Sequence, residues 1–136
     1  MIPFSKIIYT YLLTVPVFFL IDMTWLGVIA KNFYAQQLSN FLTKNVNWTA
    51  AVIFYLLYIV GIVYLAVLPG LEKRSLITVI VNAVVFGGLA YATYDLTNLA
   101  TLKNWPLPIV LVDIAWGIVL TTLVSIISYS IAQWLH

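Results

Sequence analysis

Three aspartates in apolar surroundings are the residues of this chain that point most directly to chemistry. The chain has four acidic residues in all, and Asp22, Asp95 and Asp113 lie within long hydrophobic stretches. A charged carboxylate at the centre of a membrane helix costs about 2.5–3.5 kcal/mol on insertion scales, so such residues usually face a bundle interior or a water-filled cavity. We therefore expect the three aspartates to mark a polar site inside a membrane.

Aromatic side chains share helical faces with these aspartates. The first and last apolar stretches both contain the pattern Asp-x-x-Trp, whose three-residue spacing puts the acid and the indole on one face. A longer polar stripe at 91–101 surrounds Asp95, and Tyr55 is expected at a similar depth in the second stretch. The predicted ligand-binding residues are Asp22, Asp95, Asp113, Trp25, Trp116, Tyr55, Tyr91, Tyr94 and Asn98.

Residue counts place the three aspartates at one depth. Asp22 and Asp95 each lie seven residues before the end of an apolar stretch, and Asp113 lies six residues after the start of one that runs the opposite way. At 1.5 Å per residue, all three lie roughly 9–11 Å below the same membrane face. If they converge, their oxygen ligands would favour a hard cation such as Ca²⁺, Mg²⁺ or Mn²⁺. The alternative is that each acid hydrogen-bonds a local threonine, tyrosine or tryptophan.

Composition identifies an integral membrane protein. The chain is 64% hydrophobic and 7% charged, with a mean hydropathy of +1.08, whereas soluble domains are about 25% charged. It has no cysteine and one histidine, which excludes thiolate chemistry and sites built from paired imidazoles. The formal net charge of +2 is small and its basic residues are scattered, so nucleic acid is not an expected partner. No cofactor is expected.

Four apolar stretches predict an all-α, four-transmembrane-helix bundle that forms one integral membrane domain over 1–136. The predicted spans are 7–29, 48–68, 76–102 and 107–135, with Pro69-Gly70 ending the second. The connection 30–47 has apolar residues at helical spacing and predicts an amphipathic interfacial segment. It is either a linker that lies along the headgroups or a lid over the aspartate site.

An even number of spans puts both termini on one side of the membrane. The basic residues divide almost equally, with Lys6, Lys73 and Arg74 on one side and Lys31, Lys44 and Lys103 on the other. The compact Lys73-Arg74 turn favours termini inside, although the near tie leaves the orientation open. Four short helices are a thin wall around a pathway, so a homodimer is a further expectation.

Three motifs carry a resemblance to a known family. They are IDMTWLG at 21–27, YDLTNLATLKNWP at 94–106 and VDIAWG at 112–117. With them the chain resembles an uncharacterised bacterial family of small membrane proteins, catalogued as a domain of unknown function. The resemblance covers most of the chain. It implies a four-helix protein of the inner membrane and carries over no activity, substrate or catalytic residue.

Three classes of function fit these observations. The first is a binding or transport protein, whose aspartate and aromatic pocket holds a cation, an amphiphilic small molecule or a lipid. Its intramembrane acids would allow transport to be coupled to protons. The second is a membrane enzyme that does acid–base chemistry on a lipid or isoprenoid, with Asp95 and Asp113 as acid and base and Tyr94 or Trp116 stabilising positive charge. The third is a structural or assembly subunit. Membrane lipids are expected neighbours in every case.

Overall fold

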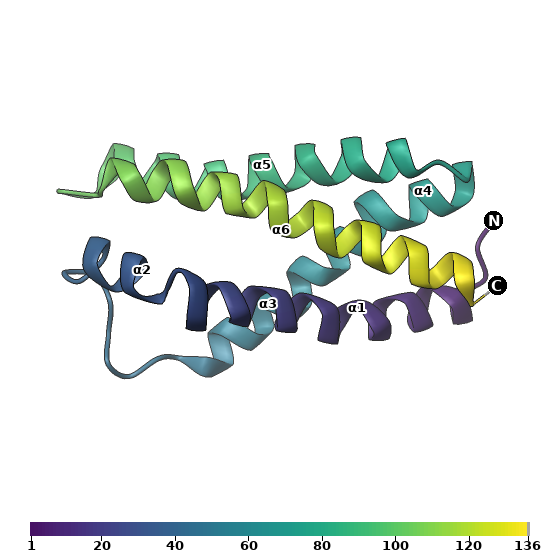
Figure 1. Cartoon of the computed structure of the whole chain (residues 1–136), viewed down its shortest axis with the longest axis horizontal. Helices are drawn as coiled ribbons and strands as arrows, with labels where there is room; N and C mark the ends of the chain where they lie inside the picture. Colours follow the sequence, from purple (N-terminus) through teal and green to yellow (C-terminus); the bar gives the residue numbers. More distant parts are fainter. Residues whose placement is uncertain (136) are drawn as a thin grey trace.

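Four apolar helical segments make up most of the fold (Figure 1). The computed structural model describes residues 1–135, and within them the segments run over Phe4–Ile29, Trp48–Lys73, Leu76–Thr101 and Leu107–Trp134. They are 26, 26, 26 and 28 residues long. At 1.5 Å per residue each reaches roughly 39–42 Å, enough to cross a ~30 Å hydrocarbon core. The predicted all-α bundle of four membrane-length helices is confirmed.

Two of the four segments change helical type along their length. The first consists of α1 (Phe4–Thr24) and a π-helical turn, Trp25–Ile29. The second consists of α3 (Trp48–Ile62), a π-helical turn at Val63–Val67 and α4 (Leu68–Lys73). The other elements are a short helix, α2 (Lys31–Gln37), and the two uninterrupted helices α5 (Leu76–Thr101) and α6 (Leu107–Trp134).

The second segment extends five residues beyond its predicted end, because Pro69-Gly70 does not terminate it. Proline lacks the N–H that would bond the carbonyl four residues earlier, which here belongs to Leu65. That carbonyl oxygen instead accepts a hydrogen bond from Nδ2 of Asn82 on α5, at 2.8 Å. The neighbouring helix therefore satisfies the group that Pro69 leaves free, as membrane bundles often do.

Helices α5 and α6 form the tightest pair in the bundle, joined by a short turn (Figure 1). Glycines permit their close approach. A Cβ added at Gly87 would lie 2.6 Å from the backbone oxygen of Gly117 and 2.7 Å from Oγ1 of Thr121. A Cβ at Gly117 would lie 2.1 Å from the ring of Tyr91. These contacts fix the antiparallel register of the two helices.

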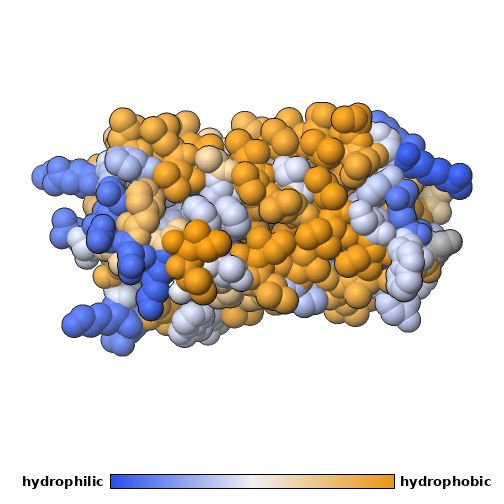
Figure 2. Space-filling view, viewed as in Figure 1, coloured by the Kyte–Doolittle hydropathy of each residue, from blue (hydrophilic) through white to orange (hydrophobic). Residues whose placement is uncertain are grey.

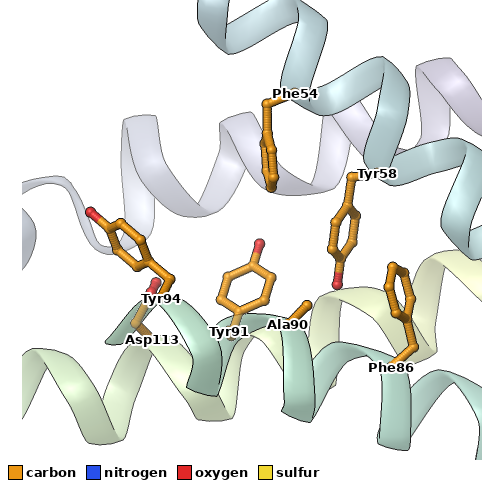
Figure 3. Close-up of a pocket in the computed structure, with 7 residues that line it drawn as sticks. All are labelled: Phe54, Tyr58, Phe86, Ala90, Tyr91, Tyr94 and Asp113. Carbon is orange, nitrogen blue, oxygen red and sulfur yellow. The ribbon is translucent and has the colours of Figure 1, made fainter. Parts of the chain in front are cut away.

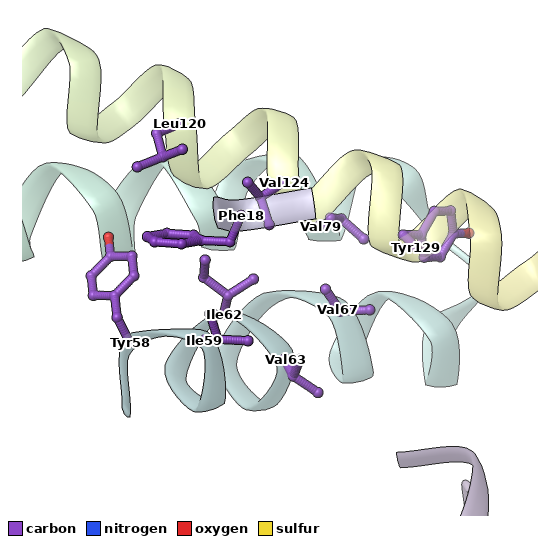
Figure 4. Packing of buried hydrophobic residues seen from close by; sticks show 10 residues of the cluster. All are labelled: Phe18, Tyr58, Ile59, Ile62, Val63, Val67, Val79, Leu120, Val124 and Tyr129. Carbon is purple, nitrogen blue, oxygen red and sulfur yellow. The ribbon is translucent and has the colours of Figure 1, made fainter. Parts of the chain in front are cut away.

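The second segment crosses the bundle obliquely. Its first part, α3, packs against α1, whereas its π-helical turn and α4 pack against α5 (Figure 1). The core lies at this crossing and gathers side chains of all four segments (Figure 4). Its buried members are Phe18, Tyr58, Ile59, Ile62, Val63, Val67, Val79, Leu120, Val124 and Tyr129.

The outer surface matches a membrane setting. On the face shown in Figure 2, a broad apolar band covers the middle of the bundle, and hydrophilic residues gather at its two ends. The start of α1 and the end of α6 lie at one end, while α2 and the turn between α5 and α6 lie at the other (Figure 1). This arrangement agrees with the predicted placement of the termini on one side.

The connection 30–47 is not a free linker at its start. Leu38, which follows α2, is 8% exposed and packs in a small apolar cluster with Trp105, in the turn before α6, and with Ile109 and Val110, near the start of α6. The helix α2 is therefore docked on the end of the bundle nearest to Asp113. A lid over the aspartate site requires such a position, and a linker along the headgroups permits it, so both predicted roles stay predictions.

Candidate functional site

The two Asp-x-x-Trp motifs meet between the first and last segments. The indole rings of Trp25 and Trp116 stack with centroids 4.4 Å apart and planes 10° apart. Nε1 of Trp116 donates a hydrogen bond to Oδ1 of Asp22 at 3.1 Å. The tryptophan of the last segment thus holds the aspartate of the first, which the sequence pattern alone does not reveal.

Trp25 is linked to Asp113 only indirectly, through a tyrosine of α2. Nε1 of Trp25 donates to the hydroxyl of Tyr34 at 3.3 Å, and that hydroxyl donates to Oδ1 of Asp113 at 2.7 Å. Burial and the hydrogen bond to Asp113 raise the pKa of Tyr34 above its ordinary value, so its hydroxyl remains a donor. Tyr34 therefore ties α2 to the aspartate site.

Asp22 is buried and well surrounded. It is 3% exposed, and besides Trp116 it has the hydroxyl of Tyr55 beside its carboxyl group. Tyr55 is held by edge-to-face contacts with Phe18 and Phe19, whose ring centroids lie 5.2 and 5.1 Å away. This arrangement provides hydrogen-bond donors for a carboxylate that lipid would not solvate.

Asp95 differs from the other two aspartates. It is 0% exposed, and no N–H or hydroxyl group of the described residues donates a hydrogen bond to either carboxyl oxygen, whose polar neighbour is the carboxyl group of Asp113. The pairing of Gly87 with Thr121, and of Tyr91 with Gly117, places Asp95 opposite Asp113 on α6. Asp113 is accordingly the acidic neighbour of Asp95, and its charge is also close enough to repel a charge on Asp22.

The three aspartates do not form the shared cation site that the sequence suggested. Within residues 1–135, no group of three acidic or histidine side chains lies close enough to hold a metal ion. The physical reason is the position of α6, which packs against α5 on one side and against α1 on another (Figure 1). Asp22 and Asp95 therefore approach Asp113 from different helices instead of meeting around one point.

An aromatic cavity of about 410 Å³ lies between α3, α5 and α6 (Figure 3). Asp113 supplies its carboxylate, and the hydroxyl of Tyr91 points into the space (Figure 3). The full lining consists of Phe54, Tyr58, Phe86, Ala90, Tyr91, Tyr94 and Asp113. The cavity exists because α3 packs against α1 and leaves a gap beside α5.

The walls of the cavity are fixed by packing. The ring of Tyr58 stacks on Phe86 with centroids 4.8 Å apart and lies edge-on to Tyr91 at 6.0 Å. Its hydroxyl shares a 2.7 Å hydrogen bond with the hydroxyl of Thr121. Gly117 gives the ring of Tyr91 the room it occupies. The cavity is therefore a built feature of three helices and not a loose gap.

Comparison with known proteins identifies the family. The family model described as "Predicted membrane protein (DUF2177)" matches residues 7–130.

The chain belongs to this family. The match confirms the resemblance inferred from the three motifs, and its description gives a membrane location and no activity. No curated protein and no solved structure matches the chain. The family and the four spans establish a membrane protein, while the inner membrane stays a prediction.

The predicted site residues fall into two groups in the structure. Tyr91, Tyr94 and Asp113 line the cavity. The others lie outside its lining: Asp22, Trp25, Trp116 and Tyr55 belong to the network around Asp22, and Asp95 and Asn98 lie further along α5.

Sequence reasoning missed two kinds of residue. The first is the wall formed by Phe54, Tyr58, Phe86 and Ala90, since apolar positions in a membrane helix give no sign of which gap they border. The second is Tyr34, which belongs to the amphipathic pattern of the connection. Its spacing with Phe33 and Leu38 was visible, but its hydrogen bond to a residue 79 positions away was not.

Proposed function

We propose that this protein binds an amphiphilic molecule whose cationic group is held by Asp113 in the aromatic cavity. The observation that carries the proposal is the lining itself: one carboxylate at the edge of a space otherwise lined by aromatic rings and an alanine. Carboxylates pair with cations, and aromatic faces attract organic cations through their quadrupoles. The volume, about 410 Å³, lies within the range of small-molecule pockets.

The chemistry of the lining favours an organic cation over an inorganic one. A Ca²⁺ ion needs six to eight oxygen ligands, and Mg²⁺ keeps several waters in an octahedral shell. The lining supplies one carboxylate and three tyrosine hydroxyls, and one of these hydroxyls is already paired with Thr121. An alkylated or aromatic ammonium loses less hydration on entry and gains contact with the rings.

The enzymatic alternative gains less support from this geometry. A general acid and a general base must both come within hydrogen-bond reach of the substrate. Asp113 lines the cavity but Asp95, its proposed partner, does not. Binding is therefore the simpler reading, and movement of the bound molecule across the membrane would be an extension of it.

Equilibrium dialysis of tetraphenylphosphonium against protein in lipid nanodiscs tests the proposal. Empty nanodiscs give the amount that partitions into lipid, and triphenylphosphine oxide serves as an uncharged aromatic probe. We expect saturable binding of the cation and none of the neutral probe. Asp113→Asn should remove the binding, since it keeps an acceptor for Tyr34 but loses the charge.

The fourth acidic residue of the chain provides a matched control. Glu72 is exposed on α4 and lies outside the cavity, so Glu72→Gln should leave binding unchanged. Circular dichroism would establish that both variants are folded. Equal binding by the wild type and Asp113→Asn, or none above empty nanodiscs, would overturn the proposal.

A further inference from the structure

A second hollow adjoins the aromatic cavity along α5. This side groove has a volume of about 540 Å³ and shares Phe86 and Ala90 with the cavity. Its other lining residues are Leu65, Asn82, Val85, Leu89 and Thr93. The two hollows therefore lie next to each other on α5 and meet at the side chains of Phe86 and Ala90.

The side groove presents an apolar surface to whatever fills it. Its two polar side chains already have partners within the protein. Nδ2 of Asn82 bonds the backbone oxygen of Leu65 at 2.8 Å, and Oγ1 of Thr93 bonds that of Leu89 at 2.6 Å. The polar groups that remain available are those of the cavity, above all Asp113. Polarity therefore falls from the cavity toward the groove.

The groove lies where lipid tails surround the protein. Asn82 is six residues after the start of α5 and Thr93 is eight before its end, which places the groove around the middle of the span. Val85 and Leu89 are 52% and 66% exposed, so the groove opens outward and not into the bundle. At bilayer depth an outward apolar surface meets acyl chains. Asp113, six residues after the start of α6, lies nearer the membrane face beside α2.

We propose that the cavity and the side groove together hold a single-chain amphiphile, with its amine head at Asp113 and its alkyl chain along Phe86 and Ala90 into the groove. This inference rests on the proposed function and names the class of its ligand. The distance supports a long chain, because the twelve residues from Tyr94 to Asn82 correspond to roughly 18 Å of helix.

The lining also selects the head group. It contains no lysine or arginine, and its one charge is the carboxylate of Asp113. A phosphate placed there would be repelled by Asp113 and would find no cationic side chain, whereas an ammonium finds a counter-ion. The ligand is therefore a long-chain amine and not a phospholipid whose phosphate must enter the cavity.

Photolabelling with hexadecyltrimethylammonium that carries a diazirine near the middle of its chain tests this assignment. The protein is irradiated in nanodiscs, and adducts are located by mass spectrometry with and without excess unlabelled amphiphile. We expect labelling of Leu65, Val85 and Leu89 that the competitor removes. Labelling of Val81, which is 54% exposed but outside both hollows, should persist as background from lipid-dissolved probe.

Two variants separate this inference from the proposed function. Val85→Trp fills the side groove at an outward position, and Val81→Trp adds the same indole one turn away. Val85→Trp should abolish competable labelling yet leave tetraphenylphosphonium binding intact, and Val81→Trp should change neither. If the small cation binds but groove labelling is not competable, the chain lies elsewhere and the inference fails alone. If the small cation does not bind, the proposed function fails first.

Discussion

Substitution of Gly87 by alanine tests the close pairing of α5 and α6 most directly. The new Cβ would lie 2.6 Å from the backbone oxygen of Gly117 and 2.7 Å from Oγ1 of Thr121. The oxygen of Gly117 is a backbone atom and cannot rotate away, so the two helices must separate. Extra methylene groups in well-packed interiors cost about 1–3 kcal/mol. We expect the free energy of unfolding to fall by an amount toward the upper part of that range.

The neighbouring glycine is a matched control. A Cβ at Gly88 would meet only the side chain of Ile118, at 3.5 Å, which is ordinary contact. Both substitutions carry the same gain in helix propensity, about 0.8–1.0 kcal/mol in soluble helices. That contribution cancels in the difference between Gly87→Ala and Gly88→Ala. The difference therefore isolates the cost of the clash, about 1–3 kcal/mol.

Equilibrium unfolding in mixed micelles, with a denaturing detergent added stepwise, measures this difference. Helical circular dichroism and the fluorescence of the five tryptophans give independent readings. Gly87→Ala should unfold at a lower fraction of denaturing detergent than Gly88→Ala. If the two variants unfold together, the pairing that sets Asp95 opposite Asp113 is refuted.

Three further substitutions probe individual contacts by the same unfolding measurement. Trp116→Phe removes the N–H that bonds buried Asp22 and should lower the free energy of unfolding by about 1–3 kcal/mol. Trp25→Phe serves as the comparison, and a loss for Trp116→Phe no larger than that of Trp25→Phe would contradict the role of this bond. Asp95→Leu removes a buried carboxyl group that receives no hydrogen bond from an N–H or hydroxyl group of the described residues, so the free energy of unfolding should hold or rise. A marked loss would show that the contact of Asp95 with the carboxyl group of Asp113 stabilises the fold. Arg74→Gly relieves a left-handed backbone with φ of 50° and should add up to about 1–2 kcal/mol; no gain would show that the turn is unstrained.

The connection 30–47 is a case in which the local sequence predicted the helix but not its contacts. Apolar spacing correctly indicated a short amphipathic helix, and α2 is observed at Lys31–Gln37. The same spacing suits a headgroup linker or a docked lid, because both bury one face. The contact of Leu38 with Trp105 and the bond from Tyr34 to Asp113 come from residues far apart in sequence.

Pro69 gives a second case. Proline followed by glycine is a usual helix end, and residues 69–70 were expected to close the second span. The helix continues because Pro69 lies in the first turn of α4, directly after the π-helical turn, and Asn82 on another segment bonds the carbonyl of Leu65. The local rule failed here because the π-helical turn and the contact with α5 both depend on how the segments pack.

The sequence by itself determined the class of this protein. Its apolar content and the lengths of its four hydrophobic stretches require helices that satisfy their own backbone groups in lipid, which fixes an all-α membrane bundle. The three motifs also indicated the family. Helical periodicity further showed which residues share a face with each aspartate.

Only the tertiary structure decided which helix each face meets. The position of α6 beside both α1 and α5 keeps the three aspartates from surrounding one ion, and the oblique course of α3 opens the cavity beside Asp113. Periodicity fixes a direction around one helix axis, but the partner in that direction depends on how separate helices pack. In an apolar chain most positions suit either lipid or protein, so the sequence leaves that choice open.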